Sequence, residues 1–239
     1  MTDEEIKESA LAFARANKMR IARELTDRNI YKPDDMPVSI FMAGSPGAGK
    51  TEYSKSFIEL IEQGQERQVI RIDGDELRSR LPGYSGGNSF LFQGAISLIV
   101  EKMQDLALHN SQSFILDGTF SHYAKAADNV RRSLAKDGRL VIVFYVYQKP
   151  EVAWKFTVAR EEKEGRNIPR EAFIEQFLAV RENIARLRVE FGNRLNIRLV
   201  KKDYSSHSVE YVKGIYTDGP TIDQIFEEQY TREQLEKII

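Results

Sequence analysis

The stretch that decides the fold is residues 44–51, which read Gly44-Ser45-Pro46-Gly47-Ala48-Gly49-Lys50-Thr51. It matches the pattern G-x-x-x-x-G-K-[ST] of a phosphate-binding loop. In this pattern the glycines let backbone N–H groups close around phosphate oxygens without a Cβ in the way. The lysine reaches the β- and γ-phosphates, and the threonine hydroxyl binds the Mg²⁺ that accompanies them. All eight residues are therefore predicted to bind a nucleoside triphosphate, with Thr51 as a metal ligand.

The segments on either side of the loop agree with this interpretation. Residues 38–43 form an apolar run with β-branched residues, as in a buried parallel strand. Residues 52–61 can continue as a helix whose N-terminal dipole points at the phosphates. A chance glycine-rich turn would not require a strand before it and a helix after it.

Length and charge restrict the class of protein. A chain of 239 residues suits one α/β domain with appendages, or at most two small domains. It has 35 basic and 36 acidic residues and a net charge of −1, so no overall field favours nucleic acid or a membrane surface. The absence of cysteine excludes disulfides and cysteine metal sites. The acidic N-terminus does not resemble a signal peptide, and no apolar stretch approaches the ~18 residues of a membrane span. We expect a cytoplasmic protein without nucleic-acid or membrane partners.

Strand patterns alternate with helical patterns along the chain. Beyond the first strand, further strands are expected at residues 68–72, 114–116, 140–147 and 195–200. This order predicts an α/β fold, a mostly parallel sheet with helices on both faces, in the architecture of a P-loop kinase. We expect an N-terminal helical extension (1–32), a kinase domain (33–205) with a lid near 160–170, and a C-terminal strand and helix extension (206–239).

Carboxylates follow the ends of two expected strands, where ligands bind in parallel sheets. Asp75 lies just past one end, together with Asp73, and can accept the proton of an acceptor hydroxyl during phosphoryl transfer. A helix N-cap would explain one of these residues but not the pair.

Asp117 and Thr119 follow the strand at 114–116. Asp117 can contribute to the Mg²⁺ shell or hold an acceptor hydroxyl, and Thr119 can hydrogen-bond the acceptor. A simple Asp-Gly turn would explain both residues equally well, so both interpretations stay open at this point.

Arg160 and Arg170 lie on either side of a break in the helical pattern at residues 165–169, and Arg166 lies within it. In phosphate-loop kinases such a segment forms a lid whose guanidiniums neutralise charge on the transferring phosphoryl group. The alternative is a solvated helix face, which is common for arginine.

Four motifs occur in order: Gly44-x-x-x-x-Gly49-Lys50-Thr51, Ile72-Asp73-Gly74-Asp75-x-x-Arg78, Asp117-Gly118-Thr119, and Arg160 followed by Gly165-Arg166-Asn167-Ile168-Pro169. Together they resemble the zeta toxin family of P-loop kinases over about residues 37–200. The resemblance implies transfer of the ATP γ-phosphate to a hydroxyl of a UDP-activated amino sugar, typically UDP-N-acetylglucosamine. In the family this reaction inhibits cell-wall synthesis.

The resemblance also implies roles for single residues. Lys50 and Thr51 would hold ATP and Mg²⁺, with Lys50 also catalytic, and Asp75 would be the general base. The remaining roles fall into two groups: acceptor contacts by Asp73, Arg78, Asp117 and Thr119, and a catalytic phosphate clamp by Arg160 and Arg166. Asp117 would also bind the metal. It differs from the family pattern, since family members often carry Glu at this position.

Partners and rival functions complete the expectations. In the family an antitoxin lays a helix across the nucleotide site, and the capped amphipathic segment Thr2–Arg28 can do this in cis or dock a partner. Packing on the core is the alternative role of this segment. The rival functions are a P-loop kinase acting on another nucleotide or small hydroxyl metabolite, and a nucleotide-switched binding protein.

Overall fold

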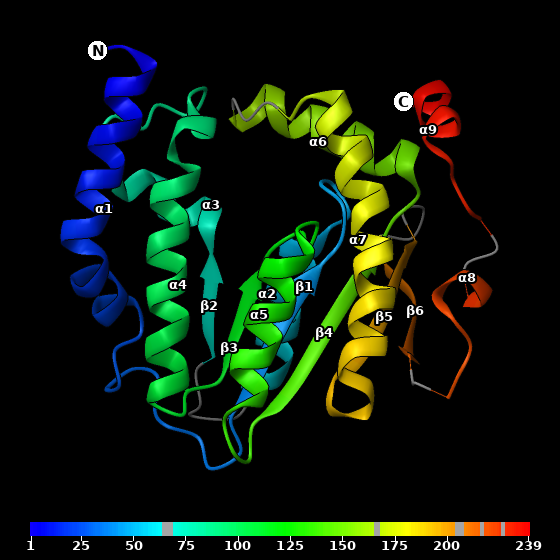
Figure 1. Ribbon diagram of the computed structural model, residues 1–239, viewed down its shortest axis with the longest axis horizontal. Helices are drawn as coiled ribbons and strands as arrows, with labels where there is room; N and C mark the ends of the chain where they lie inside the picture. The colour runs from blue at the N-terminus through cyan, green and yellow to red at the C-terminus, as the bar shows by residue number, and fades with distance from the viewer. Residues whose placement is uncertain (64–68, 165–167, 204–207, 216–217, 226–227) are drawn as a thin grey trace.

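The computed structural model describes residues 1–63, 69–164, 168–203, 208–215, 218–225 and 228–239. Its centre is a six-stranded sheet in the order β2-β3-β1-β4-β5-β6 (Figure 1). The strands are β1 (Val38–Ala43), β2 (Ile70–Asp73), β3 (Phe114–Asp117), β4 (Leu140–Tyr147), β5 (Asn196–Asp203) and β6 (Ser208–Ile215). Neighbours pair in parallel from β2 to β5, and β6 is antiparallel to β5. The predicted mostly parallel sheet is confirmed.

Helices connect the strands and cover both faces of the sheet (Figure 1). The longer ones are α1 (Asp3–Leu25), α2 (Lys50–Glu62), α4 (Gln93–His109), α5 (Tyr123–Leu134), α6 (Pro150–Glu164) and α7 (Arg170–Phe191). The shorter ones are α3 (Gly74–Leu77), α8 (Ile222–Ile225) and α9 (Arg232–Ile238). In the described part of the chain, no helix has the length and apolar character needed to cross a membrane.

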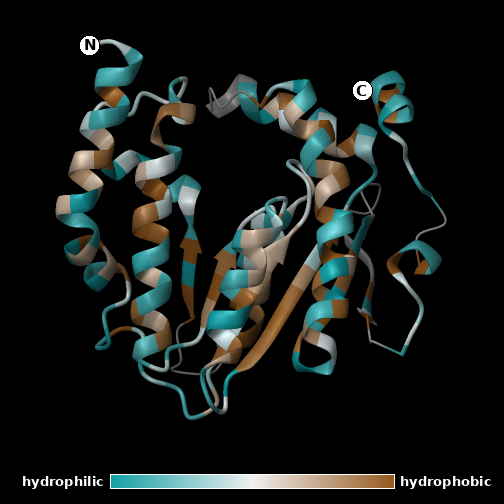
Figure 2. Ribbon diagram, viewed as in Figure 1, coloured by the Kyte–Doolittle hydropathy of each residue, from teal (hydrophilic) through white to brown (hydrophobic). Residues whose placement is uncertain are grey.

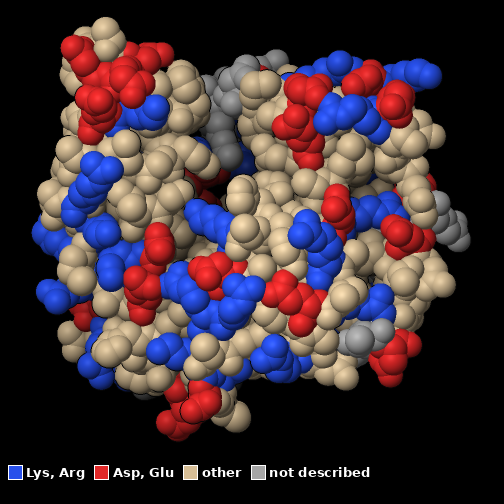
Figure 3. All heavy atoms as spheres, in the orientation of Figure 1, with Lys and Arg blue, Asp and Glu red and all other residues tan. Residues whose placement is uncertain are grey.

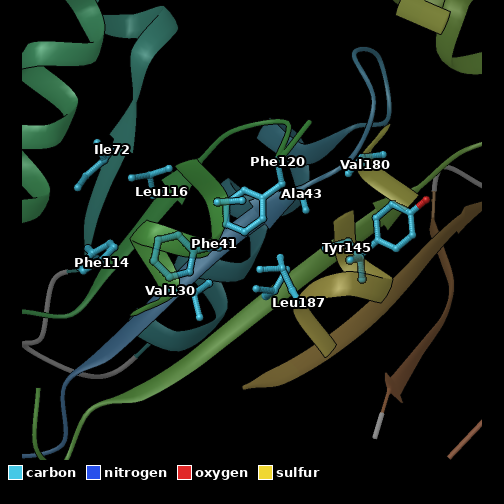
Figure 4. Close-up of a cluster of buried hydrophobic side chains, with 14 of the residues drawn as sticks. Phe41, Ala43, Ile72, Phe114, Leu116, Phe120, Val130, Tyr145, Val180 and Leu187 are labelled. Carbon is cyan, nitrogen blue, oxygen red and sulfur yellow. The ribbon is translucent and has the colours of Figure 1, made fainter. Parts of the chain in front are cut away.

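The core is divided by the sheet because successive side chains of a strand point to opposite faces. On β1, Ile40 and Met42 pack with Tyr53 and Phe57 of α2. Phe41 faces the other way, into the larger cluster formed with α4, α5 and α7 (Figure 4). Figure 2 shows apolar residues concentrated on the central strands and polar residues on the outer sides of the helices.

Helix α1 lies along α4 at the edge of the molecule (Figure 1). Its small buried residues, Ala10 and Ala14, allow close approach, and Leu11 lies against Gly94 of α4. The side chain of Glu24 forms an ion pair of 2.7 Å with Arg80, just beyond α3. The predicted capping box at Thr2 is present. This arrangement matches the core-packing role and places α1 away from the phosphate loop.

The C-terminal segment joins the same sheet and then returns to α7. Because β6 pairs with β5 along its length, β5 extends to Asp203, three residues beyond the expected end. Near the C-terminus, Arg170 of α7 donates a hydrogen bond of 3.0 Å to the Ile239 oxygen. The predicted domain boundary between residues 205 and 206 falls at positions outside the described residues, and the division into three parts stays a prediction.

Candidate active site

The phosphate loop runs from the end of β1 into the first turn of α2, where the sequence places it. At Gly44 a Cβ would lie 2.4 Å from the backbone oxygen of Val146 on β4. At Gly47 a Cβ would lie 2.0 Å from the backbone oxygen of Ala153 on α6. No real side chain tolerates such distances, so both glycines are required by close backbone contacts. The loop is thereby held between β4 and α6.

Lys50 begins α2 and folds back over the loop. Its ammonium group donates hydrogen bonds of 2.9 Å to the Gly44 oxygen and 2.7 Å to the Ser45 oxygen. Backbone N–H groups at the start of α2, together with this ammonium group, provide the positive environment that phosphate binds. Thr51 lies in the same turn and is partly exposed.

The carboxylates of Asp73 and Asp117 lie side by side at the carboxyl ends of β2 and β3, where the two residues are paired in register. Between them lies Arg71, whose guanidinium contacts Asp73 Oδ2 at 2.5 Å and forms an ion pair with Asp117 Oδ2. The Ser54 hydroxyl of α2 lies 3.0 Å from the same Asp117 oxygen and 3.1 Å from the Thr51 carbonyl. The cluster thus connects two strand ends to the first turns of α2.

This cluster perturbs the pKa values of Asp73 and Arg71. Burial raises the pKa of Asp73, and the nearby charge of Asp75 raises it further, although Arg71 and the Asp75 amide oppose the shift. Burial lowers the pKa of Arg71, but the carboxylates of Asp117 and Asp73 outweigh that effect and the net pKa is raised. Arg71 is therefore a permanently charged bridge between the two carboxylates.

Arg71 and Ser54 were not identified as site residues from the sequence. The available sequence signal for Arg71 was its charge within the otherwise mostly apolar segment 68–72. In the structure its side chain is only 12% exposed. A buried arginine inside a strand requires acidic partners. For Ser54 the helical sequence contained no signal.

Asp75 lies in α3, immediately after β2. Its backbone N–H donates a hydrogen bond of 2.8 Å to Asp73 Oδ1, so the N-cap of α3 is Asp73 rather than Asp75. The Asp75 carboxylate forms an ion pair of 2.8 Å with Arg78, whose side chain is 6% exposed, whereas that of Asp75 is 32% exposed. A buried cation thus holds a carboxylate that solvent can reach.

The two carboxylate oxygens of Asp117 differ in their contacts, since Oδ2 forms the ion pair with Arg71. Its Oδ1 is buried and has no hydrogen-bond partner among the described residues. A buried carboxylate oxygen without a donor suits a Mg²⁺-bound water or an acceptor hydroxyl.

The metal expectation is compatible with these residues. No group of three or more His, Asp or Glu side chains forms a metal site in the described ranges. Mg²⁺ usually keeps several waters and takes one or two protein oxygens together with substrate phosphates. Thr51 and Asp117 fit that limited donor set.

Thr119 lies beyond β3 and connects this strand end to the phosphate loop. Its carbonyl accepts a hydrogen bond of 3.1 Å from the Gly44 N–H, and its hydroxyl lies 2.8 Å from that of Ser121. The phosphate loop and the Asp117 strand end are therefore next to each other, as the sequence predicted.

Helix α6 carries Arg160, which is partly buried. This helix contacts the phosphate loop at Gly47. A Cβ added to Gly47 would lie 2.7 Å from the Thr157 hydroxyl of α6. Arg166 and most of the expected break at 165–169 lie outside the described residues. Figure 3 shows a hollow on the surface between the regions over α4 and α6, with charged atoms visible inside it.

A phosphate loop between β1 and α2, with carboxylates at neighbouring strand ends, defines the class of P-loop nucleotide-binding α/β proteins. The chain belongs to the Zeta toxin family, because the model of that family matches residues 21–210, well over half of the chain. This is a family of kinase-like toxins. The resemblance predicted from the four motifs is therefore confirmed.

Solved structures share the fold. One from the PezAT chromosomal toxin–antitoxin system of Streptococcus pneumoniae matches with a TM-score of 0.65 and 21% identity, over 100% of this chain and 94% of that chain. A chain of the AvrRxo1-ORF1:AvrRxo1-ORF2 complex with sulphate ions matches with a TM-score of 0.57 and 16% identity, over 88% of this chain and 66% of that chain. The same complex with ATP gives a TM-score of 0.55 and 15% identity, over 88% and 65%.

At these identities the similarity shows the fold alone, and the chain spans about two thirds of the matched AvrRxo1 chain. No curated protein matches the sequence.

Proposed function

We propose that this protein is an ATP- and Mg²⁺-dependent kinase that phosphorylates a hydroxyl group of a UDP-activated amino sugar. The observation that carries the proposal is the position of Asp75. It is a solvent-accessible carboxylate, held by the buried Arg78, just beyond the carboxyl end of β2, which β3 separates from the phosphate-loop strand β1. A nucleotide-binding protein without transfer activity would not need such a carboxylate.

In the proposed reaction the acceptor oxygen attacks the γ-phosphorus, and the bond from phosphorus to the ADP oxygen breaks. Asp75 takes the proton of the acceptor hydroxyl. Lys50 and the loop amides bind the β- and γ-phosphates, and Arg160 and Arg166 neutralise charge on the transferring group. Bound Mg²⁺, held by Thr51 and Asp117, would neutralise negative charge on the phosphates.

Asp73 and Arg78 act on the acceptor through Asp75 in this proposal. Both side chains are almost completely buried, and each contacts Asp75. The Asp73 carboxylate accepts a hydrogen bond from the Asp75 backbone N–H, and Arg78 forms an ion pair with the Asp75 carboxylate. Asp117 and Thr119 are the acceptor-facing residues, because the Asp117 Oδ1 has capacity for a hydrogen bond that no described residue uses.

The choice of acceptor rests on the family. Membership in the Zeta toxin family supports a UDP-amino sugar, and blocking its use would starve cell-wall synthesis. One matched structure comes from the PezAT toxin–antitoxin system, and the other is a complex of the proteins AvrRxo1-ORF1 and AvrRxo1-ORF2. Both support an antitoxin protein as partner. Since ATP and UDP-sugars are cytoplasmic, we propose that the protein acts in the cytoplasm.

The proposal is tested by incubating the purified protein with ATP, Mg²⁺ and a panel of UDP-sugars, and by searching for a phosphorylated product with mass spectrometry. Asp75→Ala is the control variant. We expect a UDP-amino sugar heavier by one phosphate with the wild-type protein, and a loss of roughly 100-fold or more in its rate of formation with the variant.

Other outcomes separate the rival functions. ATP consumption that depends on Asp75, without a product from the panel, would redirect the search to other hydroxyl acceptors. ATP binding without any consumption would favour a nucleotide-switched binding protein and contradict the kinase proposal.

A further inference from the structure

Lys202 lies near the carboxyl end of β5, far from the phosphate loop in sequence but beside it in space. Its Nζ is 3.4 Å from the carbonyl oxygen of Gly49, and it would lie 2.9 Å from a Cβ added to that glycine. The pairing of β5 with β6 changes register between Lys201 and Lys202. Such irregularities redirect side chains at the ends of strands.

The described contact of Lys202 is with a backbone oxygen at a helix N-terminus. Gly49 is the N-cap of α2, so the ammonium group lies at the positive end of this helix. The Lys50 ammonium group occupies the same loop. In the parts of the chain that the structure describes, no carboxylate forms an ion pair with Lys202, and its hydrogen bond to Gly49 is long.

Two ammonium groups beside one helix N-terminus repel each other and the helix dipole. The arrangement is unfavourable for the protein alone and becomes favourable when an anion binds between these charges. Lys202 is partly buried, which limits how far its charge can move away from the loop.

We propose that Lys202 is a second cation for the nucleotide phosphates, which β5 supplies to the phosphate loop in addition to Lys50. The inference rests on the proposed function, because it takes the phosphate loop to bind a nucleoside triphosphate. It assigns a nucleotide-binding role to β5, which none of the four sequence motifs includes.

The test compares wild-type protein, Lys202→Met and Lys202→Arg by calorimetric titration with two probes, Mg²⁺-ATP and inorganic tripolyphosphate. The matched control is Lys213→Met, which removes an exposed ammonium group from β6. We expect Lys202→Met to lower the affinity for both probes about tenfold, as loss of one charge-assisted hydrogen bond implies. Lys202→Arg should retain most of the affinity, and the control should retain all of it.

Thermal unfolding without ligand distinguishes this role from structural support. Removal of a repelled charge should leave the melting temperature of Lys202→Met unchanged or higher, whereas loss of a structural contact would lower it. A lower melting temperature, unchanged affinity for both probes, or weaker binding of ATP alone would each overturn the proposal. Failure of the wild-type protein to bind either probe would overturn both this inference and the proposed function.

Discussion

Asp75 and Arg78 form an ion pair of 2.8 Å in which the arginine side chain is buried and the carboxylate is about one-third exposed. The Arg78 Nη2 also lies 3.4 Å from Gln93 Oε1, at the start of α4. Arg78 therefore connects the proposed general base to a long helix of the core and limits the directions in which this base can point.

Replacing Arg78 with Met is expected to reduce kcat of phosphoryl transfer by about 10- to 100-fold, because a misplaced base accepts the proton less efficiently. ATP affinity should stay the same. Steady-state kinetics with the phosphorylated acceptor as product measure the effect, and a folded variant is confirmed by circular dichroism. A rise in the acceptor KM at constant kcat would instead indicate direct contact between Arg78 and the acceptor.

Arg71→Met is expected to destabilise the protein by about 2–4 kcal/mol, because it leaves the buried carboxylates of Asp73 and Asp117 without their shared cation. Urea denaturation measures the free energy of unfolding. Arg20→Met is the matched control, since its ion pair with Glu24 spans 3.9 Å and is largely exposed. This control should change stability by no more than about 0.5 kcal/mol. Equal effects of the two substitutions would show that the cluster does not contribute to stability.

Asp73 is expected to titrate above the usual value of 3.8, because burial and the charge of Asp75 disfavour its ionised form. A carboxyl with a raised pKa in the folded chain contributes most to stability below 3.8, and this contribution is lost as the pH rises through the raised value. Carbon NMR of the Asp73 carboxyl measures the midpoint. Asp75→Asn should lower this midpoint, and an unchanged midpoint would show that the two carboxylates are not coupled.

Ala14→Glu in α1 is expected to lower the melting temperature, because it places a charge between α1 and α4 at a fully buried position. ATP affinity should stay the same if α1 has only a packing role. Arg15→Glu, at an exposed position of the same helix, is the control for added negative charge. Increased ATP affinity in Ala14→Glu but not in the control would support a cis-inhibitory α1.

Local sequence determined the phosphate loop and the class of fold. The loop depends on backbone conformation and on two adjacent side chains, Lys50 and Thr51, and such features are encoded within a few residues. The alternation of strand and helix patterns determined the parallel sheet, and the order of the strands along it then brought Asp73 and Asp117 to one edge.

Only the tertiary structure decided which charges share a partner. Arg71 and Asp117 are 46 residues apart, and Lys202 and Gly49 are 153 residues apart. No local sequence pattern indicates either pair, because these residues meet only when distant segments of the chain come together in the folded sheet. Asp75 illustrates the division. Its position after a strand marked it as a candidate base, but the burial of Arg78 depended on tertiary packing, which places Arg78 3.4 Å from Gln93 of α4. Local sequence thus specifies the conformation of the backbone, whereas the electrostatic environment of a site depends on contacts between distant segments.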